Sequence, residues 1–195
     1  MTLLVVGNDN LEEMMEPFYQ DLEVPEYCEG IVTDAEKKRM MDYYKKKGKK
    51  FTDFDDCYAK FGEDWNFNRY RKDDDGVWRE CSTSNPQMQW DWYEVGGRWP
   101  GTLKLKPGVK NEYGVNFSWG WPEEERKKFL KENKNRTDIA RKGDVANLDE
   151  LKFYAILING EWIETSEDGW KFGSVAEFLK DVSDDTLLTC VDYHM

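Results

Sequence analysis

The sequence predicts an α+β protein whose core is a ferredoxin-like sandwich, in the order strand, helix, hairpin, helix, strand. Three observations predict this order. An apolar run opens the chain and is followed directly by a helix start. Near the other end, Asn159–Gly160 joins two apolar segments, KFYAILI and EWIET, as a two-residue hairpin turn. A capped helical pattern and an apolar strand, TLLTCVDYH, then complete the chain. The predicted ranges are one domain over 1–195, a core from 1–25 and 150–195, and a long inserted α/β-hairpin region over 26–149.

The first strand and the early helices follow from local patterns. Thr2–Val6 is mostly apolar, which predicts a short buried strand, and Asn10 begins a short helix that Pro17 limits. Thr33 followed by Glu36 predicts a capping box at the start of a polar helix that runs into the lysines near Lys47. Thr52 begins a third helical pattern, which carries Phe54, Tyr58 and Phe61.

The middle of the chain predicts strands, turns and one more helix. DDDG is a turn and VWREC alternates as a strand does. The segment from Trp90 to Trp99 bends at Gly96–Gly97, and we expect it to form an antiparallel hairpin with the following strand TLKLK. PEEERKKFLKENK predicts a helix whose charges suit its dipole. Alternatively, the insertion forms a small lobe of its own, with a binding crevice between the two lobes.

The C-terminal elements complete the predicted sandwich. Ser174 and Glu177 predict a capped helix over SVAEFLKDV, which is residues 174–182. The last segment, TLLTCVDYH, is predicted to close the chain as an apolar strand.

Composition limits the classes of partner. The chain has 40 acidic and 28 basic residues and a net charge of −12, which repels duplex nucleic acid and anionic membranes at long range. The acidity indicates either solubility or a surface that imitates nucleic acid. No stretch approaches the ~20 apolar residues of a membrane helix, and we expect a cytoplasmic protein.

The cysteines are expected to be free thiols, because a cytoplasmic setting keeps them reduced. Cys28, Cys57, Cys81 and Cys190 lie far apart in the sequence, with no paired ligand spacing. We therefore expect no metal site and no cofactor.

The segment WDWYEVGGRW places three Trp, one Tyr, two Gly and one Arg within ten residues. Trp and Tyr faces stack on bases at about 1 to 3 kcal/mol each, Arg pairs with phosphate, and glycine amides approach phosphate closely. The alternative is a Trp-rich structural core with a tight turn and an ion pair between Asp91 and Arg98. The predicted ligand-binding residues are Trp90, Trp92, Tyr93, Gly96, Gly97, Arg98, Lys104 and Trp119.

A catalytic role is the weaker hypothesis for the end of the chain. His194 is the single histidine, and in a strand it shares a face with Asp192, which makes an Asp-oriented general base geometrically possible. No nucleophile elbow surrounds Ser118, Tyr93 or Cys81, and so the sequence favours a binding protein over an enzyme.

Three segments together resemble a family of uncharacterised proteins encoded by phages and prophages: WDWYEVGGRW, DIARKGD and the ending DDTLLTCVDYHM. Members of that family tend to end in Asp-Cys-His, whereas Tyr193 stands between Asp192 and His194 here. The resemblance implies an infected bacterial cytoplasm and no particular reaction.

These observations lead to three hypotheses. The first is a phage counter-defence protein that sequesters a nucleotide immune signal, in the manner of a sponge, and that is homo-oligomeric. The second is an acidic inhibitor that binds a host defence protein directly. The third is a small hydrolase that uses Asp192 and His194.

Overall fold

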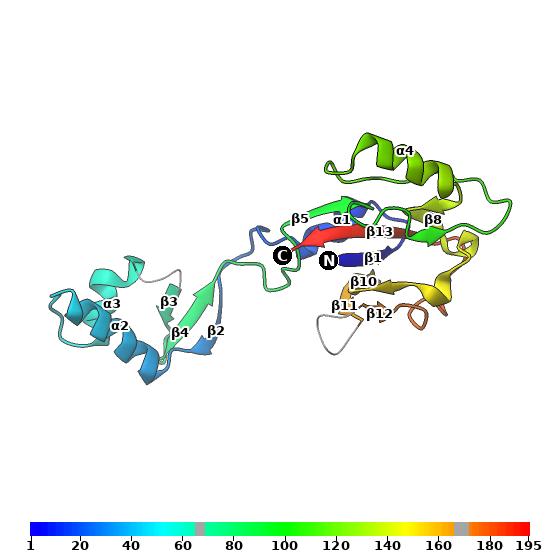
Figure 1. Cartoon of the computed structure of the whole chain (residues 1–195). Helices are drawn as coiled ribbons and strands as arrows, with labels where there is room; N and C mark the ends of the chain where they lie inside the picture. The colour runs from blue at the N-terminus through cyan, green and yellow to red at the C-terminus, as the bar shows by residue number, and fades with distance from the viewer. Residues whose placement is uncertain (65–68, 166–171) are drawn as a thin grey trace. The chain divides into compact units, whose positions relative to one another are not determined.

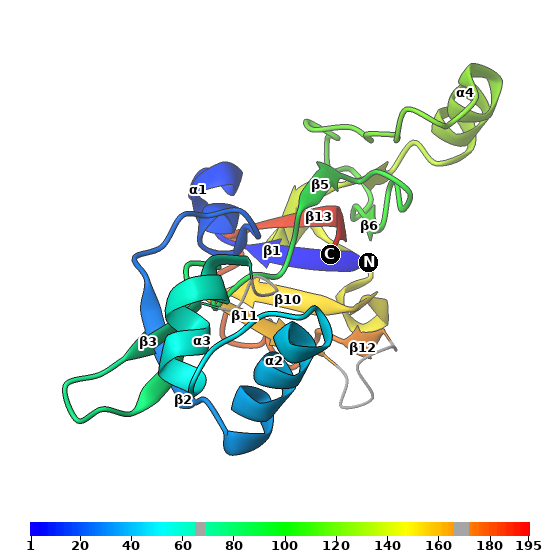
Figure 2. The ribbon, with the colours of Figure 1, turned by 90° about the vertical axis from the view of Figure 1, so that its left-hand side faces the viewer.

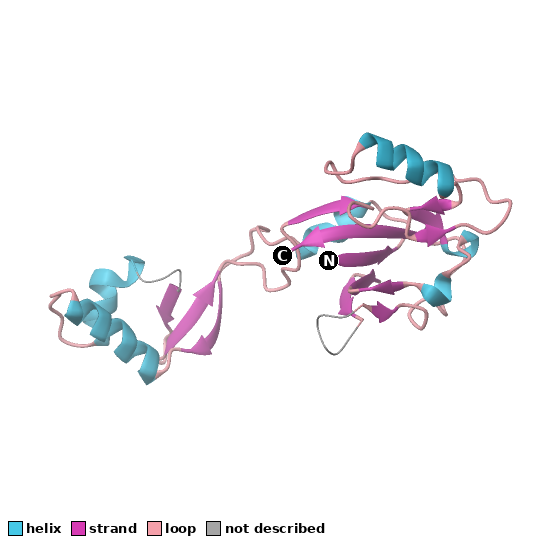
Figure 3. Cartoon of the chain, in the orientation of Figure 1, coloured by secondary structure: helices cyan, strands magenta, loops and turns pink. Residues whose placement is uncertain are grey.

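The chain divides into two compact units, which are described here one at a time (Figure 1). The computed structural model describes residues 1–64, 69–165 and 172–195. Unit 1 consists of residues 1–20 and 87–195, and unit 2 consists of residues 21–86. Both contain helices and strands, which confirms the α+β class (Figure 3).

Unit 1 is built on a six-stranded mixed sheet with the order β11-β10-β1-β13-β5, in which β8 also pairs with β13. Figure 2 shows β10, β1, β13 and β5 side by side. The central strand β1 is parallel to β10 and antiparallel to β13. The strands of this sheet are β1 (Thr2–Val6), β5 (Trp92–Val95), β8 (Ile139–Arg141), β10 (Ala155–Ile158), β11 (Glu161–Glu164) and β13 (Leu187–His194).

Shorter elements surround this sheet. The two-stranded pairs are β6 (Leu103–Lys104) with β7 (Arg136–Thr137), and β9 (Lys152–Phe153) with β12 (Gly173–Ser174). The helices are α1 (Leu11–Met15) and α4 (Glu123–Glu132), and the 3-10 turns are η1 (Glu16–Phe18), η3 (Lys142–Asp144) and η4 (Leu148–Glu150).

Both faces of the sheet are buried at its central strand β1. All five residues of β1 are buried, and their side chains alternate between two cores. Leu3 and Val5 face a core covered by α1 and η1. Leu4 and Val6 face a second core, covered in part by Leu103 and Leu105.

Most of the predicted local elements of unit 1 are confirmed. The Asn10 side chain caps α1, and the helix gives way to a 3-10 turn at Pro17. The β10–β11 hairpin turns at Asn159 and Gly160, both with positive φ.

The predicted helix over residues 174–182 is wrong, because Ser174 ends a short strand and residues 176–182 form turns and a bend. Ser174 pairs with Lys152 in the β9–β12 ladder instead of beginning a helix. Val175 and Leu179 are nevertheless buried, so their apolar spacing covers one face of the sheet without helical backbone. With this helix absent, the ferredoxin-like sandwich stays a prediction, whereas the α+β class is confirmed.

The predicted insertion also differs from the observed units. Only residues 21–86 form a separate unit, since β5 and β8 both pair with β13 of the main sheet. The expected hairpin between the tryptophan segment and TLKLK does not form. Leu103 and Lys104 pair instead with Thr137 and Arg136.

Unit 2 combines a three-stranded sheet, in the order β2-β4-β3, with two helices. The predicted capping box at Thr33 and Glu36 is confirmed, and Asp53 caps the next helix through the backbone N–H of Asp56. The core of the unit joins both helices to the sheet, with Met40, Phe54 and Tyr70 buried. Its elements are β2 (Tyr27–Ile31), α2 (Asp34–Lys46), α3 (Phe54–Phe61), η2 (Gly62–Asp64), β3 (Arg69–Lys72) and β4 (Trp78–Ser82).

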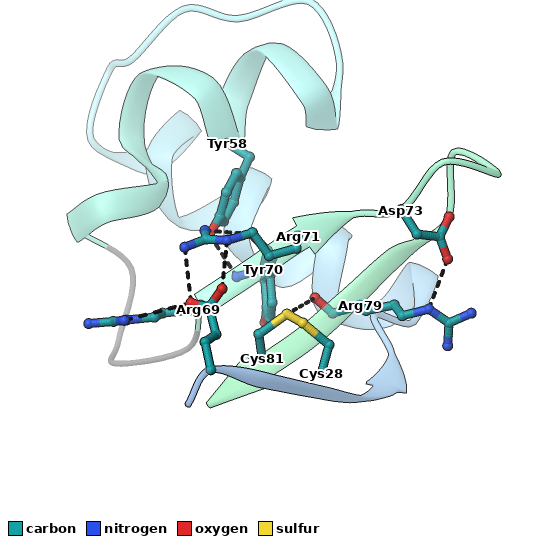
Figure 4. The surroundings of a disulfide bond; sticks show 9 residues. Cys28, Tyr58, Arg69, Tyr70, Arg71, Asp73, Arg79 and Cys81 are labelled. Carbon is teal, nitrogen blue, oxygen red and sulfur yellow. Dashed lines mark hydrogen bonds and ion pairs between the residues drawn. A yellow bond between two sulfur atoms is a disulfide. The ribbon is translucent and has the colours of Figure 1, made fainter. Parts of the chain in front are cut away.

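A disulfide corrects the expectation of free thiols. Cys28 of β2 and Cys81 of β4 are direct cross-strand partners and form a disulfide (Figure 4). Spacing along the sequence concealed this pair, because 53 positions separate the two residues and only the strand pairing brings them together. Cys57 and Cys190 are free and buried.

Among the helices of the described residues, none has both the length and the apolar character needed to cross a membrane.

Candidate functional site

The tryptophan segment forms strand β5 and the turn that follows it. β5 pairs with β13 so that Trp92 lies opposite His194 and Tyr93 lies opposite Tyr193. Side chains alternate across a strand, and so neighbouring residues of the segment point to different surroundings. The eight predicted binding residues therefore do not form a single surface.

Trp90 and Tyr93 are partly buried and pack against the hydrophobic core. The Trp90 indole Nε1 donates a hydrogen bond to the Met15 carbonyl at 2.9 Å. Its ring centroid lies 4.7 Å from that of Tyr19 and 4.8 Å from that of Tyr93. Both residues pack against the core beneath α1, so their positions do not support the predicted stacking on a ligand.

Gly96 and Gly97 are required by two buried carboxylates. Their φ angles are 70° and 59°, a region that favours glycine. A Cβ at Gly97 would lie 2.7 Å from Asp192 Cβ, and a Cβ at Gly96 would collide with the Asp138 carboxylate. The structure thus explains the glycine pair without a phosphate.

Asp138 is one of these carboxylates and was not identified from the sequence. It is fully buried, and its two oxygens accept hydrogen bonds of 2.5 Å from the backbone N–H groups of Gly101 and Asn116. Burial raises the pKa of Asp138 to about 6, although these N–H groups oppose the rise. Its role is to hold the chain after Gly114 against the glycine turn.

Asp192 is the second carboxylate and binds Arg98. Asp192 is fully buried, and its Oδ2 accepts hydrogen bonds from Arg98 Nε at 2.7 Å and from the Arg98 backbone N–H at 3.0 Å. Its Oδ1 accepts from Arg98 Nη2 at 2.5 Å. This hydrogen bonding raises the pKa of the guanidinium, and the Arg98 side chain is still 53% exposed. Arg98 is therefore held in a fixed orientation with part of its surface open.

The sequence suggested an ion pair between Asp91 and Arg98 and an imidazole of His194 oriented by Asp192, and the structure exchanges the two carboxylates. His194 Nδ1 lies 3.2 Å and 3.3 Å from the two oxygens of Asp91, and the Asp91 backbone N–H donates to the His194 carbonyl at 3.0 Å. Asp91 thus orients the imidazole in place of Asp192, and Asp192 binds Arg98 in place of Asp91. The pairing of β5 with β13, which the sequence did not indicate, explains both exchanges.

A concavity of about 430 Å³ brings together three of the predicted binding residues, Trp92, Arg98 and Trp119. Trp92, at 45% exposure, and Trp119, at 91%, contribute indole surface to it. Arg98 and the Asp91–His194 pair line the same concavity, together with Ser118 and Gly120. Small-molecule sites typically have volumes of about 300–1,000 Å³.

The loop that carries Trp119 is anchored on both sides. The Ser118 N–H donates to the Gly97 carbonyl at 3.2 Å. From α4, Arg126 donates through Nε to the Trp121 carbonyl at 2.9 Å and through Nη2 to the Ser118 carbonyl at 2.8 Å. Trp119 is thus highly exposed on a backbone that is hydrogen-bonded before and after it.

Lys104 lies elsewhere in unit 1. Its backbone N–H donates to Asn147 Oδ1 at 2.9 Å, and its carbonyl accepts from the Ala146 N–H at 2.7 Å. It is not one of the described residues that line the concavity.

The concavity can stack a planar ring on an indole and pair an anion with a guanidinium. Within the ranges that the structure describes, no group of three or more His, Cys, Asp or Glu residues is placed to hold a metal ion. The comparisons with known family models, curated proteins and solved structures give no match to this chain.

Proposed function

We propose that the chain binds a small nucleotide in the concavity between Trp92, Trp119 and Arg98. The observation that carries the proposal is the placement of two exposed indoles and a half-exposed guanidinium around one hollow of about 430 Å³. Exposed Trp side chains contribute stacking area, and a fixed Arg contributes directed donors to a phosphate.

The buried carboxylate of Asp192 supports an anion-binding role for Arg98. Asp192 accepts hydrogen bonds from Nε and Nη2 of the guanidinium, and the Arg98 side chain, still 53% exposed, belongs to a residue that lines the hollow. The net charge of −12 does not oppose this, because charges beyond about 8 to 10 Å are screened at physiological salt, whereas a direct pair is not.

We further propose that binding serves to sequester a nucleotide immune signal, as a sponge produced in the cytoplasm of a phage-infected bacterium. The resemblance of three segments to phage and prophage proteins supports this setting. We propose in addition that the protein self-associates as a homo-oligomer. We also propose the finer fold assignment of a ferredoxin-like sandwich, which the strand–helix–hairpin–strand order of unit 1 supports.

Calorimetric titration tests the binding proposal. We expect heat of binding from mononucleotides or dinucleotides, about 10-fold weaker affinity in Trp119→Ala, and no change in Tyr113→Ala, which removes an exposed ring that lines another hollow. Folded protein that gives no heat with any nucleotide contradicts the proposal.

The second candidate function is an inhibitor that binds a host protein. The 91% exposure of Trp119 on an acidic chain favours it, since exposed Trp residues are frequent binding hot spots. Capture from host lysate of a single stoichiometric partner, whose binding is weakened by salt, supports this candidate. If the chain captures such a partner and binds no nucleotide, this candidate replaces the first proposal.

A hydrolase is the third candidate, and the imidazole on the concavity wall favours it. The carboxylate that orients His194 is Asp91, so the pair differs from the Asp192–His194 pair expected from the sequence. His194→Ala would then abolish turnover of a bound nucleotide and leave its binding intact.

A further inference from the structure

A second concavity, of about 610 Å³, adjoins the same arginine. Its lining comes from the turn after β5, from Phe129 of α4 and the chain on either side of that helix, and from the segment before and within β9. The residues are 98–102, Trp121, Phe129, Asn133, Arg136, Asn147 and 150–152. Arg98 lines both concavities. Arg98, which Asp192 holds, is therefore shared by two hollows, each of which has two Trp residues in its lining.

The second concavity repeats the chemistry of the first. Trp99, 44% exposed, and Trp121 give it aromatic surface. Arg136 and Lys152 add positive charge, against one carboxylate from Glu150. Local charge here is opposite in sign to that of the whole chain, which is the pattern expected for an anion site.

The position of one of these cations is fixed. Arg136 Nη1 donates to the Gly101 carbonyl at 3.1 Å, in the turn held by Asp138. The wall formed by Trp99 is supported by Phe172, whose ring lies edge-on at a centroid distance of 5.8 Å. Arg136 and Trp99, on the walls of this concavity, are thus both held by contacts within unit 1.

We propose that the ligand is a phosphodiester-linked dinucleotide, whose phosphate lies at Arg98 and whose two bases occupy the two concavities. This inference rests on the proposed nucleotide binding and names its ligand class. A mononucleotide fills one hollow only, whereas a dinucleotide uses both aromatic walls with one shared phosphate contact. Stacking at about 1 to 3 kcal/mol per base makes the second base worth about 5- to 150-fold in affinity.

Titrations with a mononucleotide, a linear dinucleotide and a cyclic dinucleotide test the inference. We expect at least one dinucleotide to bind about 10-fold or more tightly than the mononucleotide. Trp119→Ala and Trp99→Ala should each weaken the dinucleotide about 10-fold, whereas the mononucleotide should respond to only one of the two substitutions. The linear and cyclic arms identify which linkage spans the site.

A charge reversal gives a second readout that does not depend on removing an aromatic ring. Lys152→Glu should weaken the dinucleotide, whereas Lys128→Glu, an exposed reversal on α4, should not. Equal affinity for mononucleotide and dinucleotide, or a dinucleotide insensitive to both Trp99→Ala and Lys152→Glu, overturns the two-base ligand and leaves nucleotide binding standing. Absence of binding by all three compounds overturns both.

Discussion

Gly96 and Gly97 bring the backbone against two buried carboxylates, Asp138 on one side and Asp192 on the other. Asp192 holds the guanidinium of Arg98, and Asp138 holds the backbone of Asn116 and Gly101. The glycine turn therefore packs closely against both carboxylates, one of which orients Arg98 of the candidate site.

A substitution at this turn should lower the free energy of unfolding by more than the left-handed backbone conformation alone accounts for. We expect Gly97→Ala to lower the free energy of unfolding by about 2–5 kcal/mol, because a left-handed residue costs about 1–2 kcal/mol and the clash with Asp192 adds to it. Gly108→Ala is the matched control. Its φ is 85° and its Cβ would meet nothing within 4 Å, so only the conformational cost applies. If urea denaturation shows that Gly97→Ala and Gly108→Ala lose the same free energy of unfolding, this role of the turn is contradicted.

Asp138 should make stability depend on pH. Its folded-state pKa of about 6 lies above the ordinary value of about 3.9, so the folded protein holds the proton more tightly than the unfolded chain. This contribution is present below about pH 4 and is lost as the pH rises through about 6, by up to about 3 kcal/mol.

The comparison with Asp138→Asn isolates this group. The free energy of unfolding of the wild type minus that of the variant should decrease as the pH rises from 4.5 to 7.5. A difference that is constant or rises over this interval shows that Asp138 is not the group responsible.

At the scale of elements, the pairing of β5 with β13 decides what the tryptophan segment does. It turns Tyr93 toward Tyr193 in the core and leaves Trp92 exposed beside His194. The same pairing brings Asp91 to His194 and leaves Asp192 to Arg98.

The disulfide is the main covalent constraint on unit 2. It joins β2 to β4 across 53 positions, and the chain-entropy model gives such a loop about 4 kcal/mol. We expect Cys28→Ser with Cys81→Ser to increase hydrogen exchange in β3 and β4 and to leave β1 and β13 of unit 1 unchanged. Reduction of the wild type should have the same effect, and a reductant should not affect the double variant. Unchanged exchange in β4 after reduction would contradict a stabilising role.

The sequence predicted those elements whose signals are local. Thr2–Val6, the Asn159–Gly160 hairpin and the Thr33 capping box each depend on a few adjacent residues, and the structure confirms them. Residues 174–182 have helical spacing, but tertiary packing of Val175 and Leu179 is achieved by turns instead.

The candidate site was predictable only in part for a related reason. Trp92, Arg98 and Trp119 are conspicuous as residue types, and the structure places all three on one concavity. The partners of Arg98 and His194 depend on which strands pair, and that is not a local property. Asp138 gave no signal, because an aspartate in a short polar segment does not reveal that it will be buried.

For the whole molecule, the separation into two units has a chemical consequence. Unit 2 is small, and small units depend strongly on cross-links. A reducing cytoplasm favours free thiols, so the proposed cytoplasmic setting predicts a less stable unit 2 than an oxidising compartment does. Both concavities lie in unit 1, whose single cysteine, Cys190, is not part of the disulfide.

The indole N–H signals of the tryptophans provide the most direct test of the central claim, that the hollow beside Arg98 receives a nucleotide. A ¹⁵N-labelled protein titrated with a dinucleotide should show shifts at Trp92 and Trp119, assigned by single substitution. The signal of Trp78, in unit 2, should not move. The claim is contradicted if the indole signals of Trp92 and Trp119 do not shift when the folded protein is saturated with dinucleotide. It is contradicted equally if the folded protein binds no dinucleotide.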